Sequence, residues 1–197
     1  MSAFLGPIHY WMYDKIRFQE ELTSDIAFLA ADKGWMSADQ AAAYTCEEQR
    51  PLEELIDEAN IHGWLQGRID EAESRYAALV TELLKEDGSR IEAVKEAART
   101  FGAHHAVESD AAPEAAYRRF NDVLLSGMPC DRVIVITEQD AARWAFREEQ
   151  DIHAQYWLDA EGDPEVGQAL RSEIMRGMLD GCGLTLQQID EREYAIA

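Results

Sequence analysis

A repeated segment limits what this chain can fold into more than any other feature of its sequence. "IHYWMYDKIRFQE" at residues 8–20 aligns with "IHGWLQGRIDEAE" at residues 61–73, with the same Ile-His pair, tryptophan, isoleucine and final glutamate. Each copy is followed by a glycine that ends a helix and by a serine capping box, at Ser37 and Ser89. A repeated unit of this kind buries its apolar face against its neighbouring copy. The repeat therefore predicts two helical hairpins that pack as a four-helix bundle over about residues 7–102.

The helix start and stop signals agree with this layout. Pro7 suits a first helical position because its missing N–H has no partner there, and Gly34 follows the last periodic residue. Pro51 opens a second long helix with acidic side chains in its first turns, and Gly88 ends it. Each long helix is thus expected to have a shorter partner helix behind it.

The second half of the chain predicts a smaller α+β lobe. "RVIVIT" is β-branched and "RWAFR" alternates aromatic and basic residues, so these two segments indicate a β-hairpin. Helices are predicted from Pro113, in "EEQDIHAQYWL" and after Asp163, and the tail "EREYAIA" could add a strand. We therefore expect a mainly α protein with a helical bundle over residues 1–102 and an α+β lobe over residues 113–197. The two parts could also form one integrated domain.

Charge and composition exclude several classes of partner. The chain has 18 Lys and Arg against 39 Asp and Glu, a net charge of −21, which repels phosphate backbones and anionic headgroups. Its longest apolar run, "IAFLAA", is far too short for a membrane span, and no basic-then-apolar leader opens the chain. The three cysteines follow neither a disulfide nor a zinc-knuckle spacing. These features predict a cytoplasmic protein that binds neither nucleic acid nor membrane.

Histidines and carboxylates recur on the repeated helices. His9, Tyr13 and Glu20 share one helical stripe, and His62 and Glu73 lie on the equivalent stripe of the second copy. If the two helices run parallel, the two imidazoles lie at the same end; if they run antiparallel, each histidine faces the other copy's glutamate.

A third histidine, His153, has a similar setting, with a tryptophan close behind it. Glu149 precedes it by four residues, as Glu58 precedes His62, and this spacing places both side chains on one helix face. Such a pair can ligate a metal, orient a ligating histidine or act as a general acid and base. It is also a common helical pair without any such role.

The first functional hypothesis is a metal- or haem-dependent protein, an enzyme acting on a small molecule at a site between the bundle and the lobe. Three imidazoles with carboxylate support suit Zn, Fe or Ni. The predicted metal ligands are His9, His62, His153 and Glu20, with Cys46 or Cys130 as added soft ligands, and the predicted acid–base groups are Tyr13, Glu58 and Glu149.

The second hypothesis is a non-catalytic acidic helical module that binds a small apolar ligand or a protein partner, with a homodimer left open. The sequence has none of the familiar nucleotide-binding loops, zinc-protease motifs or nucleophile elbows. It also lacks the Glu-x-x-His motif of di-iron bundles. No resemblance to a known family is specific enough to name.

Overall fold

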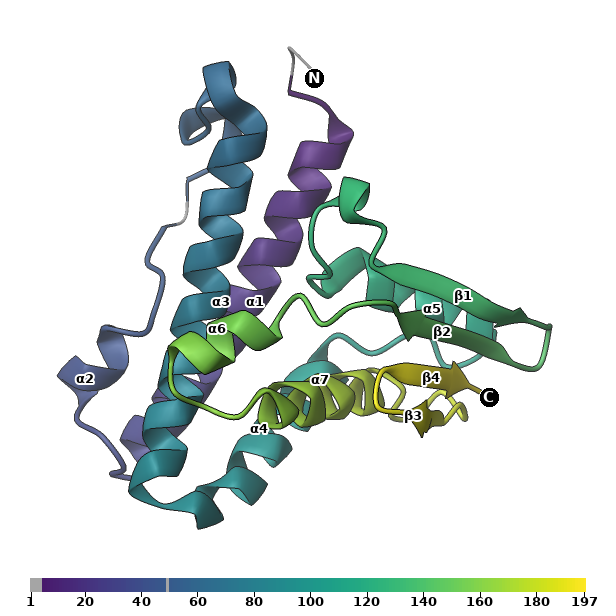
Figure 1. Cartoon of the computed structure of the whole chain (residues 1–197). Helices are drawn as coiled ribbons and strands as arrows, with labels where there is room; N and C mark the ends of the chain where they lie inside the picture. Colours follow the sequence, from purple (N-terminus) through teal and green to yellow (C-terminus); the bar gives the residue numbers. More distant parts are fainter. Residues whose placement is uncertain (1–4, 49) are drawn as a thin grey trace.

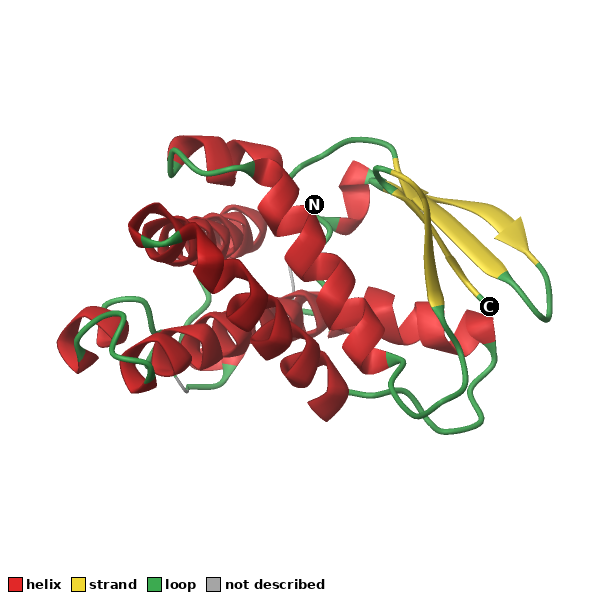
Figure 2. Ribbon diagram, turned by 90° about the horizontal axis from the view of Figure 1, so that it is seen from below, coloured by secondary structure: helices red, strands yellow, loops and turns green. Residues whose placement is uncertain are grey.

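The computed structural model describes residues 5–48 and 50–197, which form a mainly helical protein with a small antiparallel sheet at one end (Figures 1 and 2). The α-helices are α1 (Pro7–Asp32), α2 (Ala38–Ala42), α3 (Ile61–Glu86), α4 (Ile91–His104), α5 (Pro113–Val123), α6 (Ala154–Asp159) and α7 (Pro164–Met178). Short 3-10 turns occur at η1 (Leu52–Glu54), η2 (Glu58–Asn60), η3 (Gly88–Arg90) and η4 (Pro129–Asp131). The expectation of a mainly α chain with an α+β part is confirmed.

The two copies of the repeat are the first halves of α1 and α3, and these two helices run parallel, side by side (Figure 1). The rings of His9 and His62 are 5.8 Å apart between centroids. Further along, Glu20 of α1 forms an ion pair with Arg75 of α3. Because parallel neighbours start at the same end, the chain needs a long connection from the end of α1 back to the start of α3. Residues 33–60 make that connection.

The four-helix bundle of two repeated hairpins is not confirmed. α2 has only five residues, so the first copy lacks a partner helix of useful length. α4 packs mainly against α7 from the second half of the chain. At this crossing the backbones touch, since a Cβ on Gly102 would lie 2.1 Å from the carbonyl oxygen of Ile174. A Cβ on Gly177 would lie 2.0 Å from the carbonyl oxygen of Arg99, so glycine is required on both helices.

The sheet has the order β1-β2-β4-β3, with every neighbouring pair antiparallel. Its strands are β1 (Ile134–Gln139), β2 (Trp144–Glu148), β3 (Leu186–Asp190) and β4 (Glu193–Ile196). The predicted hairpin and the predicted tail strand are present, and β3 completes the sheet. Phe146 of β2 packs on Tyr117 of α5, and Tyr194 of β4 contacts Ser172 of α7. The sheet thus covers α5 and α7.

Two apolar cores lie along the pair of long helices. The smaller one includes Ile16 and Ile69, and the larger one includes Leu22, Tyr76 and residues of α4, α5, α7 and the sheet. Between them Gln19 of α1 and Glu73 of α3 line one cavity and form a polar layer. The functional groups meet in this polar layer between the two cores.

No helix in the described ranges combines the length and the apolar character needed to cross a membrane.

Candidate functional site

A partly buried histidine and a buried glutamate meet in the polar layer. The Nδ1 atom of His153 lies 2.9 Å from Oε1 of Glu73, and only 4% of the Glu73 side chain is exposed. Glu73 comes from the middle of α3, while His153 directly precedes α6, which lies across α3 in Figure 1. A carboxylate at this distance accepts the Nδ1–H of the ring and fixes its orientation.

The loop before α6 holds His153 in place. Oδ1 of Asp151 accepts hydrogen bonds from the backbone N–H groups of His153 (3.0 Å) and Ala154 (2.9 Å). Oδ2 of Asp151 accepts a bond of 2.8 Å from the Gln168 side chain on α7. The aspartate therefore connects the histidine loop to α7, as expected of a short polar side chain at a helix start.

A partly buried arginine forms the opposite wall. Arg171 of α7 donates to the Leu125 carbonyl (2.8 Å) and to Oγ of Ser126 (2.7 Å). Its Nε lies 3.2 Å from Oε1 of Glu148, a buried residue at the end of β2. Every part of this guanidinium is occupied, so Arg171 is a fixed positive charge in the wall.

The site encloses a small cavity with unpaired polar atoms. It has a volume of about 30 Å³, and its lining includes Gln19, Glu73, Tyr76, His153 and Arg171. Three buried atoms of this lining have no hydrogen-bond partner among the described residues: Nε2 of His153, the Tyr76 hydroxyl and Nε2 of Gln19. Buried polar groups are nearly always paired. Three such groups around one cavity point to a small polar occupant.

The electrostatics set the protonation states. Burial alone lowers the pKa of His153, but the charge of Glu73 and its hydrogen bond to the ring together raise it by more. The net pKa of His153 therefore lies above its ordinary value. Burial and then the charge of Glu73 raise the pKa of Tyr76, so its hydroxyl stays protonated and can donate.

The structure brings together two of the three predicted histidine ligands. His9 is buried and its Nδ1 accepts a 2.8 Å hydrogen bond from the backbone N–H of Gly6, while its ring lies against the exposed ring of His62. His153 lies elsewhere. Its partner Glu73 follows His62 by eleven residues on α3, which is about 16 Å at 1.5 Å per residue.

The common pocket expected for the three imidazoles is thus not formed. Across residues 5–48 and 50–197, no group of three or more His, Cys, Asp or Glu side chains is placed to hold one metal ion. The proposed soft ligands Cys46 and Cys130 are both free thiols.

The predicted acid–base residues lie apart from His153. Glu149 is not on its helix, because α6 begins at Ala154, and it pairs instead with Arg147 at 2.6 Å. Glu58 is exposed in η2, before the start of α3. Neither glutamate therefore lies one helical turn from a histidine, and the predicted pairs are wrong. Both have the same cause, since the two helices begin later than the sequence pattern predicted.

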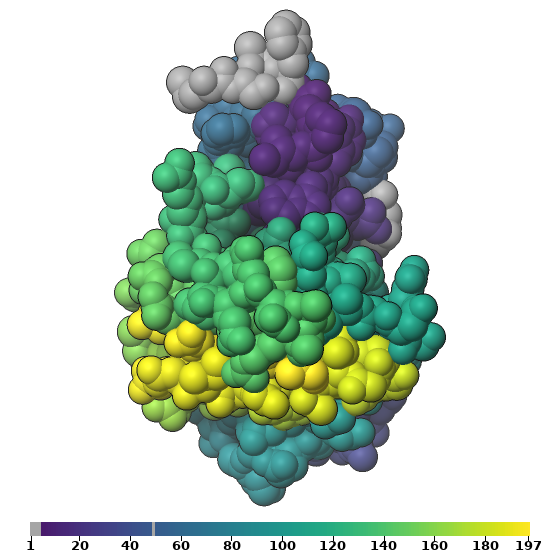
Figure 3. All heavy atoms as spheres, turned by 90° about the vertical axis from the view of Figure 1, so that its right-hand side faces the viewer, coloured from purple at the N-terminus to yellow at the C-terminus, as the bar shows by residue number. Residues whose placement is uncertain are grey.

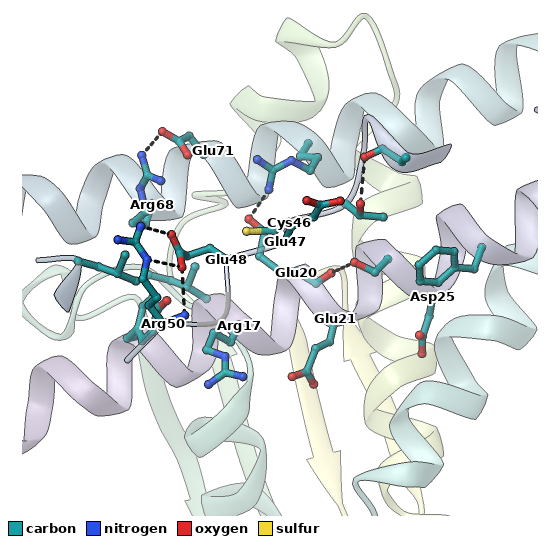
Figure 4. A pocket seen from close by; sticks show the side chains of 18 of the residues that line it. Arg17, Glu20, Glu21, Asp25, Cys46, Glu47, Glu48, Arg50, Arg68 and Glu71 are labelled. Carbon is teal, nitrogen blue, oxygen red and sulfur yellow. Dashed lines mark hydrogen bonds and ion pairs between the residues drawn. The ribbon is translucent and has the colours of Figure 1, made fainter. Parts of the chain in front are cut away.

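Tyr13 and Glu20 lie at a second cavity, a groove of about 670 Å³ lined by α1, α3 and residues from the ranges 42–48 and 50–55 (Figure 4). The Tyr13 ring is buried 6.0 Å from that of Trp64, and burial raises its pKa. Figure 4 shows Arg17, Glu20, Glu21 and Asp25 along α1 and Arg68 with Glu71 on α3.

Sequence reasoning missed most of the residues around His153. Glu73 was visible as the repeat partner of Glu20, but its contact with His153 spans eighty positions. Arg171 and Glu148 carried no motif, since an arginine on an amphipathic helix and a glutamate at a strand end are ordinary on a surface. The one usable signal was the position of Glu73 on the inward stripe of α3.

Comparisons with protein-family models, with curated proteins and with solved structures find no match for this chain. The site itself defines the class to which the protein can be assigned: a mainly α protein in which a histidine paired with a buried carboxylate faces a small polar cavity. Function is therefore argued from that geometry alone.

Proposed function

We propose that the protein is an enzyme that acts on a small polar molecule, with His153 as its general acid and base and Glu73 as the group that orients the imidazole. The observation that carries this proposal is the state of the ring: Nδ1 is held by a buried carboxylate, and the buried Nε2 has no partner among the described residues. In histidines that transfer protons, a carboxylate holds Nδ1 and fixes the ring, while Nε2 faces the reacting group.

The surroundings of the ring support the same reading. Tyr76 offers a protonated hydroxyl and Gln19 an amide N–H to the same cavity, so both can donate to an oxygen of the substrate. Arg171 adds a fixed positive charge that favours an oxygen on which negative charge develops. The cavity of about 30 Å³ has room for the reacting group only, about the size of one water. The rest of the substrate would reach it as the α6 loop moves.

The proposal keeps the small-molecule enzyme expected from the sequence but gives the chemistry to the His153–Glu73 pair. A zinc, iron or nickel centre held by protein side chains needs several converging donors, and the described residues offer no group of three or more His, Cys, Asp or Glu side chains. His9 and His62 remain a pair of adjacent rings at the far end of α1 and α3.

The test is the hydrolysis of 4-nitrophenyl acetate, a small activated ester, by the intact protein. We expect His153→Gln to lower the turnover rate by about 10²-fold, since general acid–base catalysis contributes this much or more. His104→Gln, a change at an exposed histidine, is the matched control and should leave the rate unchanged. Equal rates for wild type and His153→Gln would contradict the proposal.

A second measurement tests whether Nε2 of His153 can be reached. Diethylpyrocarbonate modifies neutral imidazoles, and peptide mapping identifies each modified histidine. We expect His153 to react in the native protein, with a pH profile set by its raised pKa. Modification restricted to the exposed His62 and His104 would show that small molecules do not reach the cavity.

The alternative function, a non-catalytic module, is favoured by the groove rather than by the buried pair. Its volume of about 670 Å³ is in the range of ligand sites, and its lining combines Tyr13, Phe28 and Trp64 with both acidic and basic side chains. A basic, partly apolar partner fits a groove of this kind on a chain of net charge −21. Under this alternative, Phe28→Ser would abolish partner binding, whereas His153→Gln would leave it intact.

A further inference from the structure

Lys15 is a buried amine outside the site described above. It lies on α1 with 2% of its surface exposed, among the most buried charged residues of the described chain. Its Nζ stands 3.7 Å above the centre of the Trp11 ring. Lysine is almost never fully buried unless a partner neutralises its charge, so this position calls for a physical explanation.

The amine has no polar partner. Within the described ranges, Lys15 forms no ion pair and no hydrogen bond, and its Nζ lies over the face of Trp11. The charge of Asp122 acts on the amine, but its carboxylate accepts a 3.3 Å hydrogen bond from Nε1 of Trp11. A buried ammonium without a carboxylate favours the neutral form.

The amine borders a cavity of about 230 Å³. Figure 3 shows the face of the molecule on which the green segment around residue 130 lies beside the purple N-terminal part of α1. The cavity lining mixes apolar and polar side chains in about equal parts. Its apolar and aromatic members are Trp11, Tyr117, Met128, Pro129, Val133 and Ile134, and the others are Lys15, Asn121, Ser126, Gly127 and Arg132. A cavity of this size takes a molecule of a few carbon atoms.

Arg132 supplies a second chemical group at the same cavity. It is exposed, follows η4 with a left-handed backbone (φ 50°), and forms no hydrogen bond or ion pair with any described residue. A free guanidinium is suited to bind a carboxylate through two parallel hydrogen bonds. The cavity therefore presents a nucleophilic amine and a carboxylate-binding cation among side chains of mixed polarity.

We infer that Lys15 is a covalent binding site for a small 2-oxo acid, whose carbonyl condenses with the amine and whose carboxylate is held by Arg132. The neutral amine adds its electron pair to the carbonyl carbon and forms a C–N bond. Proton transfer and loss of water then break the former C–O bond and leave a protonated imine. The reaction consumes one carbonyl compound and releases one water, so no oxidant or reductant is needed.

The protonation state of its amine distinguishes Lys15 from the other lysines of the chain. Burial and then the charge of Arg171 lower the pKa of Lys15, the charge of Asp122 raises it, and the net pKa is about 7. Roughly half of Lys15 is then neutral at pH 7, whereas an ordinary lysine of pKa about 10.4 is neutral in roughly one molecule in 10³. Lys33 and Lys85 are exposed and serve as internal references for ordinary lysines.

The test is reductive trapping on the intact protein. Wild-type protein is incubated at pH 7 with pyruvate and sodium borohydride, whose hydride reduces the imine to a stable secondary amine, and peptides are mapped by mass spectrometry. We expect one adduct per chain, at Lys15, and its loss in Lys15→Met. Adducts spread over Lys33, Lys85 and Lys95, or none at Lys15, would overturn the inference.

A second comparison tests the carboxylate part. Acetone carries the carbonyl without the carboxylate, so Arg132→Gln should lower the pyruvate adduct about tenfold and leave the acetone adduct unchanged. Arg119→Gln, at a partly exposed arginine outside the cavity lining, is the matched control. Equal loss or equal retention of both adducts in Arg132→Gln would overturn the assignment to a 2-oxo acid. Because His153 takes no part in trapping, the result is independent of the proposed acid–base function.

Discussion

His153 and Lys15 are both basic side chains held inside the protein, but their surroundings differ in one respect. His153 has the buried carboxylate of Glu73 at 2.9 Å, and its pKa is raised. Lys15 has the face of Trp11 and no carboxylate in contact, and its pKa is lowered. Burial acts against the charge in both cases, so the presence of a partner decides which form each group takes. The partner thus suits His153 to proton transfer, and the lack of one suits Lys15 to act as a nucleophile.

The two groups also share a wall. Arg171 lowers the pKa of both His153 and Lys15 through its charge. It donates a hydrogen bond of 2.7 Å to Ser126, which lines the Lys15 cavity, while Arg171 itself lines the His153 cavity. A change in charge at one cavity therefore alters the electrostatic environment of the other. Substitutions at either cavity can test the comparison between His153 and Lys15.

The largest expected effect comes from removing the partner of His153. Glu73→Ala leaves the imidazole buried without a carboxylate, and breaking a buried ion pair in this way costs about 3 kcal/mol of unfolding free energy. Urea denaturation at pH 6, where His153 is charged in the wild type, measures the loss. Glu71→Ala, two residues away on the exposed side of α3, removes only a surface pair with Arg68 and should cost less than about 0.5 kcal/mol. Similar losses in the two variants would show that the Glu73–His153 pair contributes no more to stability than a surface ion pair.

Lys15 should respond in the opposite direction. Lys15→Met replaces an unpaired buried amine by an apolar side chain of similar length, and we expect it to stabilise the protein by about 2 kcal/mol at pH 7. The unfolded chain keeps this amine protonated up to its ordinary pKa, whereas the folded protein releases the proton near pH 7. The gain should therefore shrink as pH rises from 7 toward 10.

Denaturation curves at pH 7 and pH 9 test this difference. Lys33→Met, at an exposed lysine after α1, is the control and should show no gain at either pH. A loss of stability in Lys15→Met would indicate that the amine has a carboxylate partner in solution.

The pH dependence of His153 gives a smaller effect of opposite slope. Its folded pKa lies above the ordinary value of 6.5, so the stability contributed by the charged pair is complete below that value and is lost as pH rises through the folded pKa. The stability of wild type minus that of His153→Gln should fall across this range. A ¹⁵N NMR titration of the ring gives the pKa directly. A folded pKa of His153 at or below 6.5 would contradict the expected fall of stability with pH.

Much of the helical framework could be predicted because it depends on local pattern. The repeat located α1 and α3, and Pro7 lies at the first residue of α1 as its missing N–H requires. The repeat did not extend to the partner helices, which have five residues in α2 and fourteen in α4. The packing of α4 on α7 depends on Gly102 and Gly177, whose role appears only when the two backbones meet.

The candidate site was less predictable, for a related physical reason. His153 was singled out with Glu149 as its partner, on the assumption of a helix running through both residues. Asp151 caps a helix that begins at Ala154 instead, and this turns His153 toward α3. A contact between residues eighty positions apart has no local signature. The burial of Lys15 has none either, since it depends on α5 and η4 covering that side of α1.

The smallest expected effect tests what Trp11 does for Lys15. The negative face of an aromatic ring stabilises a cation above it by about 0.5–1 kcal/mol, so the ring opposes the effect of burial on the amine. Trp11→Leu keeps an apolar side chain but removes that face, and we expect the pKa of Lys15 to fall by about half a unit. The ¹³Cε chemical shift of Lys15, followed with pH, measures this change, and Trp64→Leu on α3 is the matched control. A rise in the pKa would mean that Trp11 acts mainly by excluding water from the amine, and that the ring contributes to its burial more than to its charge.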